Sequence, residues 1–245
     1  NMNNFENNYL NEQGNTRVLS NSFVANVFLW MFGALALSAL TAYIFGTSEN
    51  LISLLFTVTP QGGARMSLFG WIVTFAPLII VMTMSFRVNK MKASSMMALF
   101  VLYSVLMGVS LSFIFTAFTS SSIFKTFIIT AGMFGIMAIV GYTTNTDLTK
   151  FGSILLMALV GIIIATLVNF FMHSSSLDFI ISIIGVIVFT GLTAYDVQTI
   201  KRIGMMGINE GETMTKITIH AALNLYLDFL NIFLYLLRFF GNNND

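Results

Sequence analysis

The sequence contains no cysteine, only two prolines and few charged residues. Without cysteine the chain forms no disulfide bond and offers no thiolate ligand to a metal ion. Charged residues make up 9% of the chain, against about 25% in a typical soluble domain, and this scarcity excludes a soluble globular protein. The formal net charge of +1 gives no basis for binding nucleic acid, and we expect none.

Alternation of apolar and polar residues is also missing from the hydrophobic stretches, which are continuous. Runs of about 20 apolar residues indicate membrane-spanning helices, because a spanning backbone must satisfy its own hydrogen bonds, whereas barrel strands alternate. The sequence therefore predicts an all-α integral membrane domain at 22–241, between a disordered or interfacial polar tail at 1–21 and a short tail at 242–245. Seven spans are expected: Ser22–Phe45, Phe69–Phe86, Ser94–Phe118, Ile123–Tyr142, Phe151–Met172, Leu177–Asp196 and Ile217–Phe240.

Two features of these helices bear on their packing. Pro77 lies in the middle of the second span, where it removes a backbone hydrogen bond and is expected to bend the helix, either statically or for gating. Small residues recur every four positions in the first and third spans, and such stripes let helices approach closely in lipid. The stripes are Ala34, Ser38 and Ala42 in the first span and Ser104, Gly108 and Ser112 in the third.

Basic residues are distributed unequally between the two ends of the expected bundle. An odd number of spans places the termini on opposite sides, and the excess of Lys and Arg on the N-terminal side predicts that this side is cytoplasmic. We therefore expect a multi-pass protein of the cell (inner) membrane, with the C-terminus outside. The N-terminal side carries Arg17, Arg87, Lys90, Lys92, Lys150, Lys201, Arg202 and Lys216, and the other side carries Arg65, Lys125 and Arg238.

Two aspartates interrupt the last two apolar runs: Asp196 in "GLTAYDVQTIKRI" and Asp228 in "LNLYLDFLNIFLYLL". An aspartate at the centre of a span costs about 2.5–3.5 kcal/mol on insertion scales, and such residues face the bundle interior and mark functional sites. Each lies in a polar stripe with helical spacing, so we expect the two stripes to face each other. The stripes are His220, Asn224, Asp228, Asn231 and Tyr235 in the last span, and Thr190, Thr193 and Asp196 in the sixth.

Two adjoining carboxylates inside a bundle do not both ionise readily, because burial and mutual repulsion each disfavour the second charge. Asp196 and Asp228 are therefore expected to share a proton and to titrate as a coupled pH sensor. When both are ionised they form an oxygen-rich site suited to Ca²⁺, with His220, Asn224, Asn231 and Thr193 as supporting residues. Arg87, at the cytoplasmic end of the second span, is either a counter-ion of Asp196 or a plain positive-inside anchor. The alternative for the acids is that each pairs separately with a nearby Arg, Lys or hydroxyl and only locks the fold.

The residues around both aspartates resemble the signatures of the Bax inhibitor-1, or transmembrane Bax-inhibitor-motif, family, and the resemblance is closest to its bacterial branch. "GLTAYDVQTIKRI", "LNLYLDFLNIFLYLLRFFG", "FRVNKM" and "GYTTNTDLTKFG" occur in the family's order. The resemblance implies two three-helix layers around a central C-terminal helix. It also implies a pH-sensitive Ca²⁺ leak controlled by a hydrogen-bonded aspartate pair, at Asp196 and Asp228, with Arg87 as the gating arginine.

Other functions have weaker support in the sequence. An intramembrane aspartyl protease also uses two aspartates on consecutive helices, but its Gly-x-Gly-Asp and Pro-Ala-Leu motifs are missing here. A proton-coupled transporter, or a regulator that binds a membrane protease, stays open as an alternative, although no internal repeat favours an inverted-repeat transporter. We therefore expect a passive calcium channel and not an enzyme. Its interacting species would be the lipid bilayer, Ca²⁺ as the transported or transiently bound ion, and protons, without an organic cofactor.

Overall fold

The computed structural model describes residues 2–58, 64–206 and 211–241, without the side chains of residues 2–19, 58 and 64. Within these residues the all-α prediction is confirmed, since seven helices are long and apolar enough to cross a membrane. They are α1 (Met2–Thr47), α3 (Leu68–Arg87), α4 (Ala93–Leu111, with its span continuing to Ala117), α6 (Ser120–Thr143), α7 (Thr149–Met172), α8 (Ser175–Met205) and α9 (Glu212–Phe240). The C-terminal tail expected at 242–245 lies outside the described residues.

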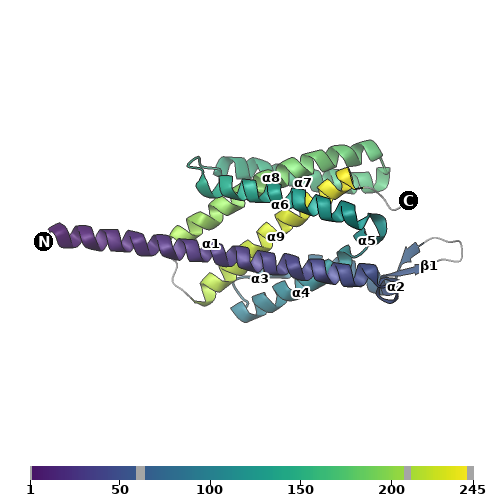
Figure 1. Cartoon of the computed structure of the whole chain (residues 1–245), viewed down its shortest axis with the longest axis horizontal. Coiled ribbons are helices and arrows are strands. Elements are labelled where there is room, and N and C mark those ends of the chain that lie inside the picture. Colours follow the sequence, from purple (N-terminus) through teal and green to yellow (C-terminus); the bar gives the residue numbers. More distant parts are fainter. Residues whose placement is uncertain (1, 59–63, 207–210, 242–245) are drawn as a thin grey trace.

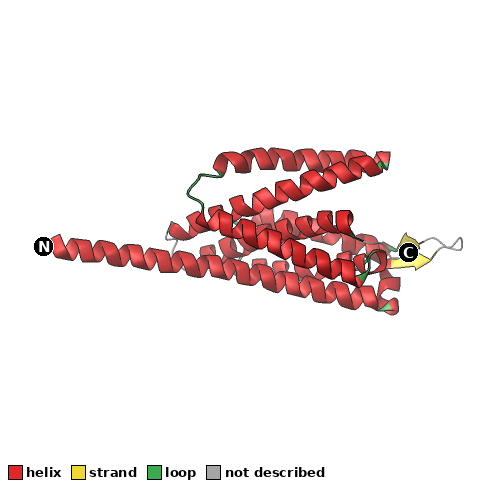
Figure 2. Cartoon of the chain, turned by 45° about the horizontal axis from the view of Figure 1, so that its top comes forward, coloured by secondary structure: helices red, strands yellow, loops and turns green. Residues whose placement is uncertain are grey.

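The remaining elements are short and lie at one end of the bundle. Helix α2 (Glu49–Leu55) and the antiparallel strands β1 (Phe56–Val58) and β2 (Ala64–Met66) connect α1 to α3, and α5 (Ile114–Ala117) follows α4. The strands were not expected from the sequence. Figure 2 shows this pair as the only strands of the described chain, projecting beyond the helices.

Two helices are longer than the sequence predicted. Helix α1 begins at Met2, so the polar segment expected to be a disordered or interfacial tail is helical, because extending a formed helix adds a hydrogen bond per residue without a new nucleus. Helix α8 continues beyond Asp196 to Met205. Its added turns carry Gln198 and Arg202, whose side chains bind the loop between α6 and α7.

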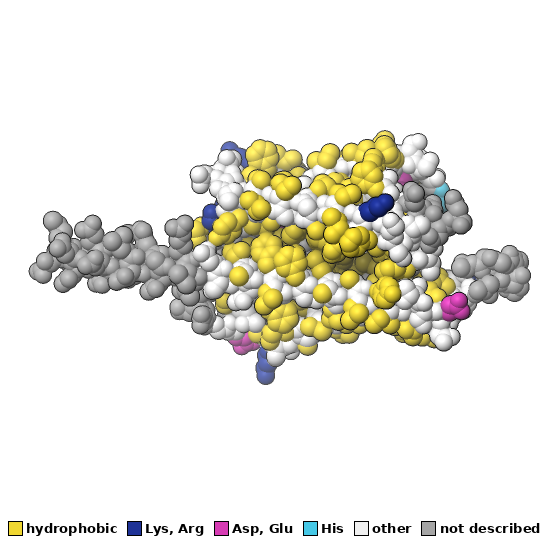
Figure 3. Space-filling model, viewed as in Figure 1, with side chains coloured by type: hydrophobic (Ala, Val, Ile, Leu, Met, Phe, Trp, Pro, Cys, Tyr) yellow, Lys and Arg dark blue, Asp and Glu magenta, His cyan; other side chains and the backbone are white. Residues whose placement is uncertain are grey.

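The spans form two groups with α9 between them. Helices α1, α3 and α4 pack together on one side and α6, α7 and α8 on the other, and α9 contacts α1, α4, α6 and α8. In Figure 1, α9 crosses the bundle diagonally between these groups. Figure 3 shows hydrophobic side chains across the flank of the bundle, with charged side chains mainly near its two ends. This surface is suited to lipid.

Helix α9 supplies more buried hydrophobic residues than any other described helix. In its most apolar window 67% of the residues are buried, against 6% in α7. Tyr226 packs edge-on against Phe100 and Tyr103 of α4, and Phe229 packs against Phe127 and Phe134 of α6. The helix is thus fixed by aromatic contacts on both sides.

The small-residue stripes pack as predicted, and they bring helix backbones into contact. A Cβ atom at Gly108 of α4 would collide with Ser38 and Thr41 of α1, so only glycine fits there. The Ser38 hydroxyl donates to the Ser104 carbonyl over 2.6 Å. At the α6–α8 crossing, a Cβ atom at Gly141 would meet the backbone of Ala194.

Candidate functional site

A cavity of ≈ 710 Å³ lies between α3, α7, α8 and α9, and it contains both predicted aspartates. We call it the central cavity. The polar stripe of α9 reaches it through Asn224, Asp228, Asn231 and Tyr235, and the other polar lining residues are Thr166, Tyr195 and Asp196. Leucine and isoleucine form most of the remaining wall, together with Phe189. The stripe of α9 therefore meets Asp196 of α8 at this cavity, whereas Thr190 and Thr193 of the predicted α8 stripe do not line it.

The two acids have different surroundings. Asp228 is 4% exposed and its Oδ2 atom has no hydrogen-bond partner within the described part of the chain, whereas Asp196 is half-buried. Both acids line the central cavity, but no hydrogen bond joins the two side chains among the described residues. An unpaired buried carboxylate oxygen is energetically costly. Asp228 is therefore suited to bind a proton, a water molecule or a cation.

A second cavity, of ≈ 370 Å³, lies at the end of the bundle where α3 ends and α9 begins. We call it the end cavity. Asn89, Thr199 and His220 supply its other polar lining, and Asp196 and Asn224 line both this cavity and the central one. These two side chains therefore form the partition between the two spaces.

The predicted supporting residues are distributed unevenly. Asn231 lies in the central cavity, His220 in the end cavity, and Asn224 in both. Thr193 is fully buried, but its hydroxyl donates to the carbonyl of Phe189 in its own helix over 2.9 Å, and it lines neither cavity. The structure thus assembles the amides of α9 at the acids and leaves Thr193 apart.

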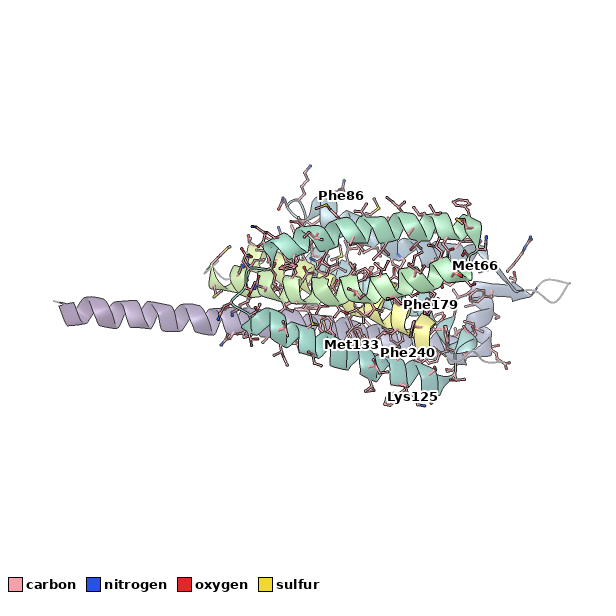
Figure 4. All side chains as sticks on the ribbon, turned by 90° about the horizontal axis from the view of Figure 1, so that it is seen from above. Met66, Phe86, Lys125, Met133, Phe179 and Phe240 are labelled. Carbon is pink, nitrogen blue, oxygen red and sulfur yellow. The ribbon has the colours of Figure 1, made fainter. Side chains whose placement is uncertain are left out.

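Arg87 lies at the last position of α3 and is exposed. Its neighbours Val88 and Asn89 line the end cavity, but Arg87 forms no ion pair with Asp196. In Figure 4, Phe86 beside it lies toward the end of the bundle from which α1 extends, and Phe240 lies toward the other end. Arg87 is therefore near the mouth of the end cavity without touching the acids.

Several lining residues were not expected from the sequence. Leu78 of α3 and Ile163 of α7 form walls of the central cavity, and Thr166 of α7 also lines it. Of these three residues, only Thr166 could have been predicted to line a cavity, because it is a polar residue in a strongly apolar run. An apolar residue in a membrane helix gives no such signal, because lipid and a cavity wall select the same side chains.

A second polar cluster joins the extended end of α8 to the α6–α7 loop. Arg202 pairs with Asp147 and donates to the Thr149 hydroxyl, while Gln198 accepts from Leu148 N over 2.9 Å and donates to Thr146 O over 2.8 Å. Hydrogen bonds from Thr149, and then the guanidinium of Arg202, hold the pKa of the Asp147 carboxyl well below its usual range. This cluster holds the α6–α7 loop against α8, within two helical turns of Asp196.

The fold and the acid-lined cavities define a multi-pass helical membrane protein with an intramembrane carboxylate site. Comparison with known proteins gives the family: the one described as "Inhibitor of apoptosis-promoting Bax1" matches residues 20–245, and the chain belongs to it. The inner membrane protein YbhL of Escherichia coli strain K12 is 45% identical over 222 residues, which are 90% of this chain and 92% of that protein. An uncharacterized protein of Borreliella burgdorferi is 45% identical over 228 residues, or 93% and 95% of the two chains. The uncharacterized protein RP147 of Rickettsia prowazekii is 42% identical over 223 residues, or 91% and 90%.

Proposed function

We propose that the chain is a pH-sensitive calcium leak channel in which Asp196 and Asp228 sense protons and contact the passing ion. The observation that carries this proposal is the position of Asp196, which lines the end cavity and also faces Asp228 in the central cavity. An ion that enters the end cavity meets Asp196 and Asn224 before it reaches Asp228. Asp196 thus lies where the two spaces join, with Asp228 beyond it in the central cavity. The proposed activity is passive flux without enzymatic chemistry.

Proton binding would control the charge of this passage. When the acids hold protons, the passage is neutral and offers Ca²⁺ little compensation for its lost water. When both acids are ionised, their oxygens and the amide oxygens of Asn224 and Asn231 provide part of the six to eight ligands that Ca²⁺ takes. The described residues contain no group of three or more His, Cys, Asp or Glu that would hold a metal. A two-carboxylate site therefore favours passage of the ion over tight retention.

The gating arginine and the orientation complete the proposal. Arg87 would act as a lock by approaching the mouth of the end cavity, which its neighbours Val88 and Asn89 line. The excess of basic residues at this end supports a cytoplasmic position for it. The name of YbhL as an inner membrane protein supports the same membrane for this chain. The end cavity would then open toward the cytoplasm.

The test is Ca²⁺ entry into proteoliposomes between pH 5 and pH 8. We expect the flux through the wild type to titrate with pH and either Asp196→Asn or Asp228→Asn to flatten the curve. Asp178→Asn is the matched control, because this acid pairs with Arg238 at the other end of the bundle over 2.8 Å and lines neither cavity. Flux no greater than in empty vesicles at every pH would refute the leak. An unchanged titration in both cavity variants would refute the sensor.

A further inference from the structure

The central cavity opens sideways between two helices, toward the hydrocarbon of the bilayer. Leu78 of α3 and Ile163 and Leu167 of α7 line the cavity, and each is 53–59% exposed. Helix α3 packs mainly on α4 and α7 mainly on α8, and these two wholly described helices make no extensive contact with each other. Only 6% of the most apolar window of α7 is buried, so this helix lies at the outside of the bundle. A molecule dissolved in the bilayer therefore has a lateral route to the acids.

The walls and the floor of this cavity differ in chemistry. The walls toward the lipid are leucine and isoleucine, whereas the floor contains Asp196, Asn224, Asp228 and Asn231. Within the described residues, two acceptors of the floor are free: Oδ2 of Asp228 has no hydrogen-bond partner, and the amide of Asn231 uses its Nδ2 to donate to Leu227 O over 2.8 Å, leaving Oδ1 to accept. Hydroxyl groups of Thr166, Tyr195 and Tyr235 also line the cavity, but no described lysine, arginine or histidine does. The complementary ligand is therefore a hydrogen-bond donor with positive charge and an apolar tail.

We propose that the central cavity binds a single-chain alkylamine, with its ammonium group at Asp228 and Asp196 and its chain between α3 and α7. An ammonium group has three donors for the acceptors of the floor. A volume of ≈ 710 Å³ lies within the roughly 300–1,000 Å³ of small-molecule sites. An anionic amphiphile would bring a negative charge to the acids, and a neutral one without a basic nitrogen would take no proton from Asp228 and form no ion pair with it.

The lateral route is compatible with proton balance. An amine crosses hydrocarbon as the neutral base, and the lone pair of its nitrogen then takes the proton of the Asp228 carboxyl. One O–H bond breaks and one N–H bond forms, which gives an ammonium–carboxylate pair with no change in the total charge of the site. Binding requires the cavity and its acids but no ion conduction, so this inference does not rest on the proposed channel activity.

Native mass spectrometry of the purified full chain in detergent tests the proposal with octylamine as the probe, and with 1-octanol and octanoate as neutral and anionic controls. We expect a saturable one-to-one adduct with octylamine alone. Asp228→Asn should weaken it roughly ten- to hundredfold, the range for losing hydrogen bonds to a charged group. Ile163→Trp should block the lateral opening while leaving both acids in place. Ile164→Trp is the matched control, because Ile164 has similar exposure, 56% against 53%, but does not line the cavity.

Three results would overturn the proposal. Equal binding of 1-octanol or octanoate would show an apolar groove without recognition of the amine. Equal octylamine binding by the two tryptophan variants would show that the ligand does not enter between α3 and α7. The lack of a saturable adduct with the folded wild type would exclude the site. Octylamine binding by a chain that passes no Ca²⁺ would refute the leak channel alone and leave this site standing.

Discussion

The hydroxyl of Tyr226 lies 2.7 Å from the Ser38 hydroxyl, and this buried hydrogen bond joins the central helix α9 to α1. Ser38 also donates to the Ser104 carbonyl of α4. Ser38 therefore connects three helices. Its partner Tyr226 lies two residues before Asp228 in α9. The same helix carries the tyrosine that is anchored here and the acid that faces the central cavity.

Tyr226→Phe should lower the free energy of unfolding by about 0.6–1.7 kcal/mol, the range for hydrogen bonds between membrane helices. The ring keeps its packing against Phe100 and Tyr103, so the loss reports the hydroxyl alone. Thermal or SDS-induced unfolding in detergent micelles measures it. Tyr43→Phe, at an exposed position, is the control and should leave stability unchanged. Equal stability of all three proteins would show that this hydrogen bond contributes nothing.

Gly141→Ala should destabilise the α6–α8 crossing by about 1–3 kcal/mol, because the added methyl group would meet the backbone of Ala194 and backbone does not yield cheaply. Gly135→Ala on the same helix is the matched control, since nothing lies within 4 Å of its added Cβ atom. That change should be neutral or stabilising by up to about 1 kcal/mol. The same unfolding assay separates the two. Similar losses in both variants would contradict the close crossing.

Arg87→Gln should raise Ca²⁺ flux at neutral pH if Arg87 locks the channel. An ion pair formed by an exposed side chain contributes about 0.2–1 kcal/mol, so the closed state should lose at most about fivefold in population. Lys90→Gln removes a charge at the same end and serves as the control. Proteoliposome flux measures both. The same effect in both variants would assign the change to surface charge and would leave Arg87 as a positive-inside anchor.

The Asp147 cluster predicts an acid-dependent loop. The pKa of Asp147 is lower in the folded chain than in the unfolded chain, so its contacts with Thr149 and Arg202 stabilise the loop fully above about pH 4 and are lost as the pH falls further. Hydrogen exchange should show constant protection of the Leu148 and Thr149 amides from pH 8 to pH 5 and weaker protection below about pH 4. Asp147→Asn should remove this acid dependence, whereas Asp178→Asn should keep it. Loss of loop protection between pH 8 and pH 5 in the wild type would contradict the assignment of this acid dependence to Asp147. The loop could then contribute to any pH dependence of the Ca²⁺ flux in the same range.

The spans were predictable because lipid requires long apolar runs, and the meeting of Asp196 and Asp228 was predictable because polar side chains in such runs turn inward. The stripe of α8 was less reliable. Steps of three residues fall short of a full helical turn by about 60° each, so the stripe turns around the helix and Thr190 lies about 120° away from Asp196. Thr193 instead bonds to its own helix.

Other features depend on tertiary contacts that the sequence does not encode in a visible pattern. Leu78 and Ile163 look like lipid-facing residues, and only the separation of α3 from α7 makes them cavity walls. The sixth span was expected to end at Asp196, but α8 continues to Met205, and Gln198 and Arg202 in its added turns bond to the α6–α7 loop. Arg87 was a candidate counter-ion of Asp196 because both residues were expected at the same end of the bundle. A position at the same end does not require contact, and the two side chains form no ion pair.

The burial of α9 has a consequence for biosynthesis. With a mean hydropathy of 1.4, against 2.0–2.7 for the other spans, and with Asp228 within it, α9 alone partitions poorly from the translocation machinery into lipid. It follows the other six spans in the chain, so at its synthesis the helices that pack on it, α1, α4, α6 and α8, are already made. Membrane integration of α9 should therefore depend on their prior assembly. A defect in α1 or α8 would then leave α9 outside the membrane, where it would be degraded.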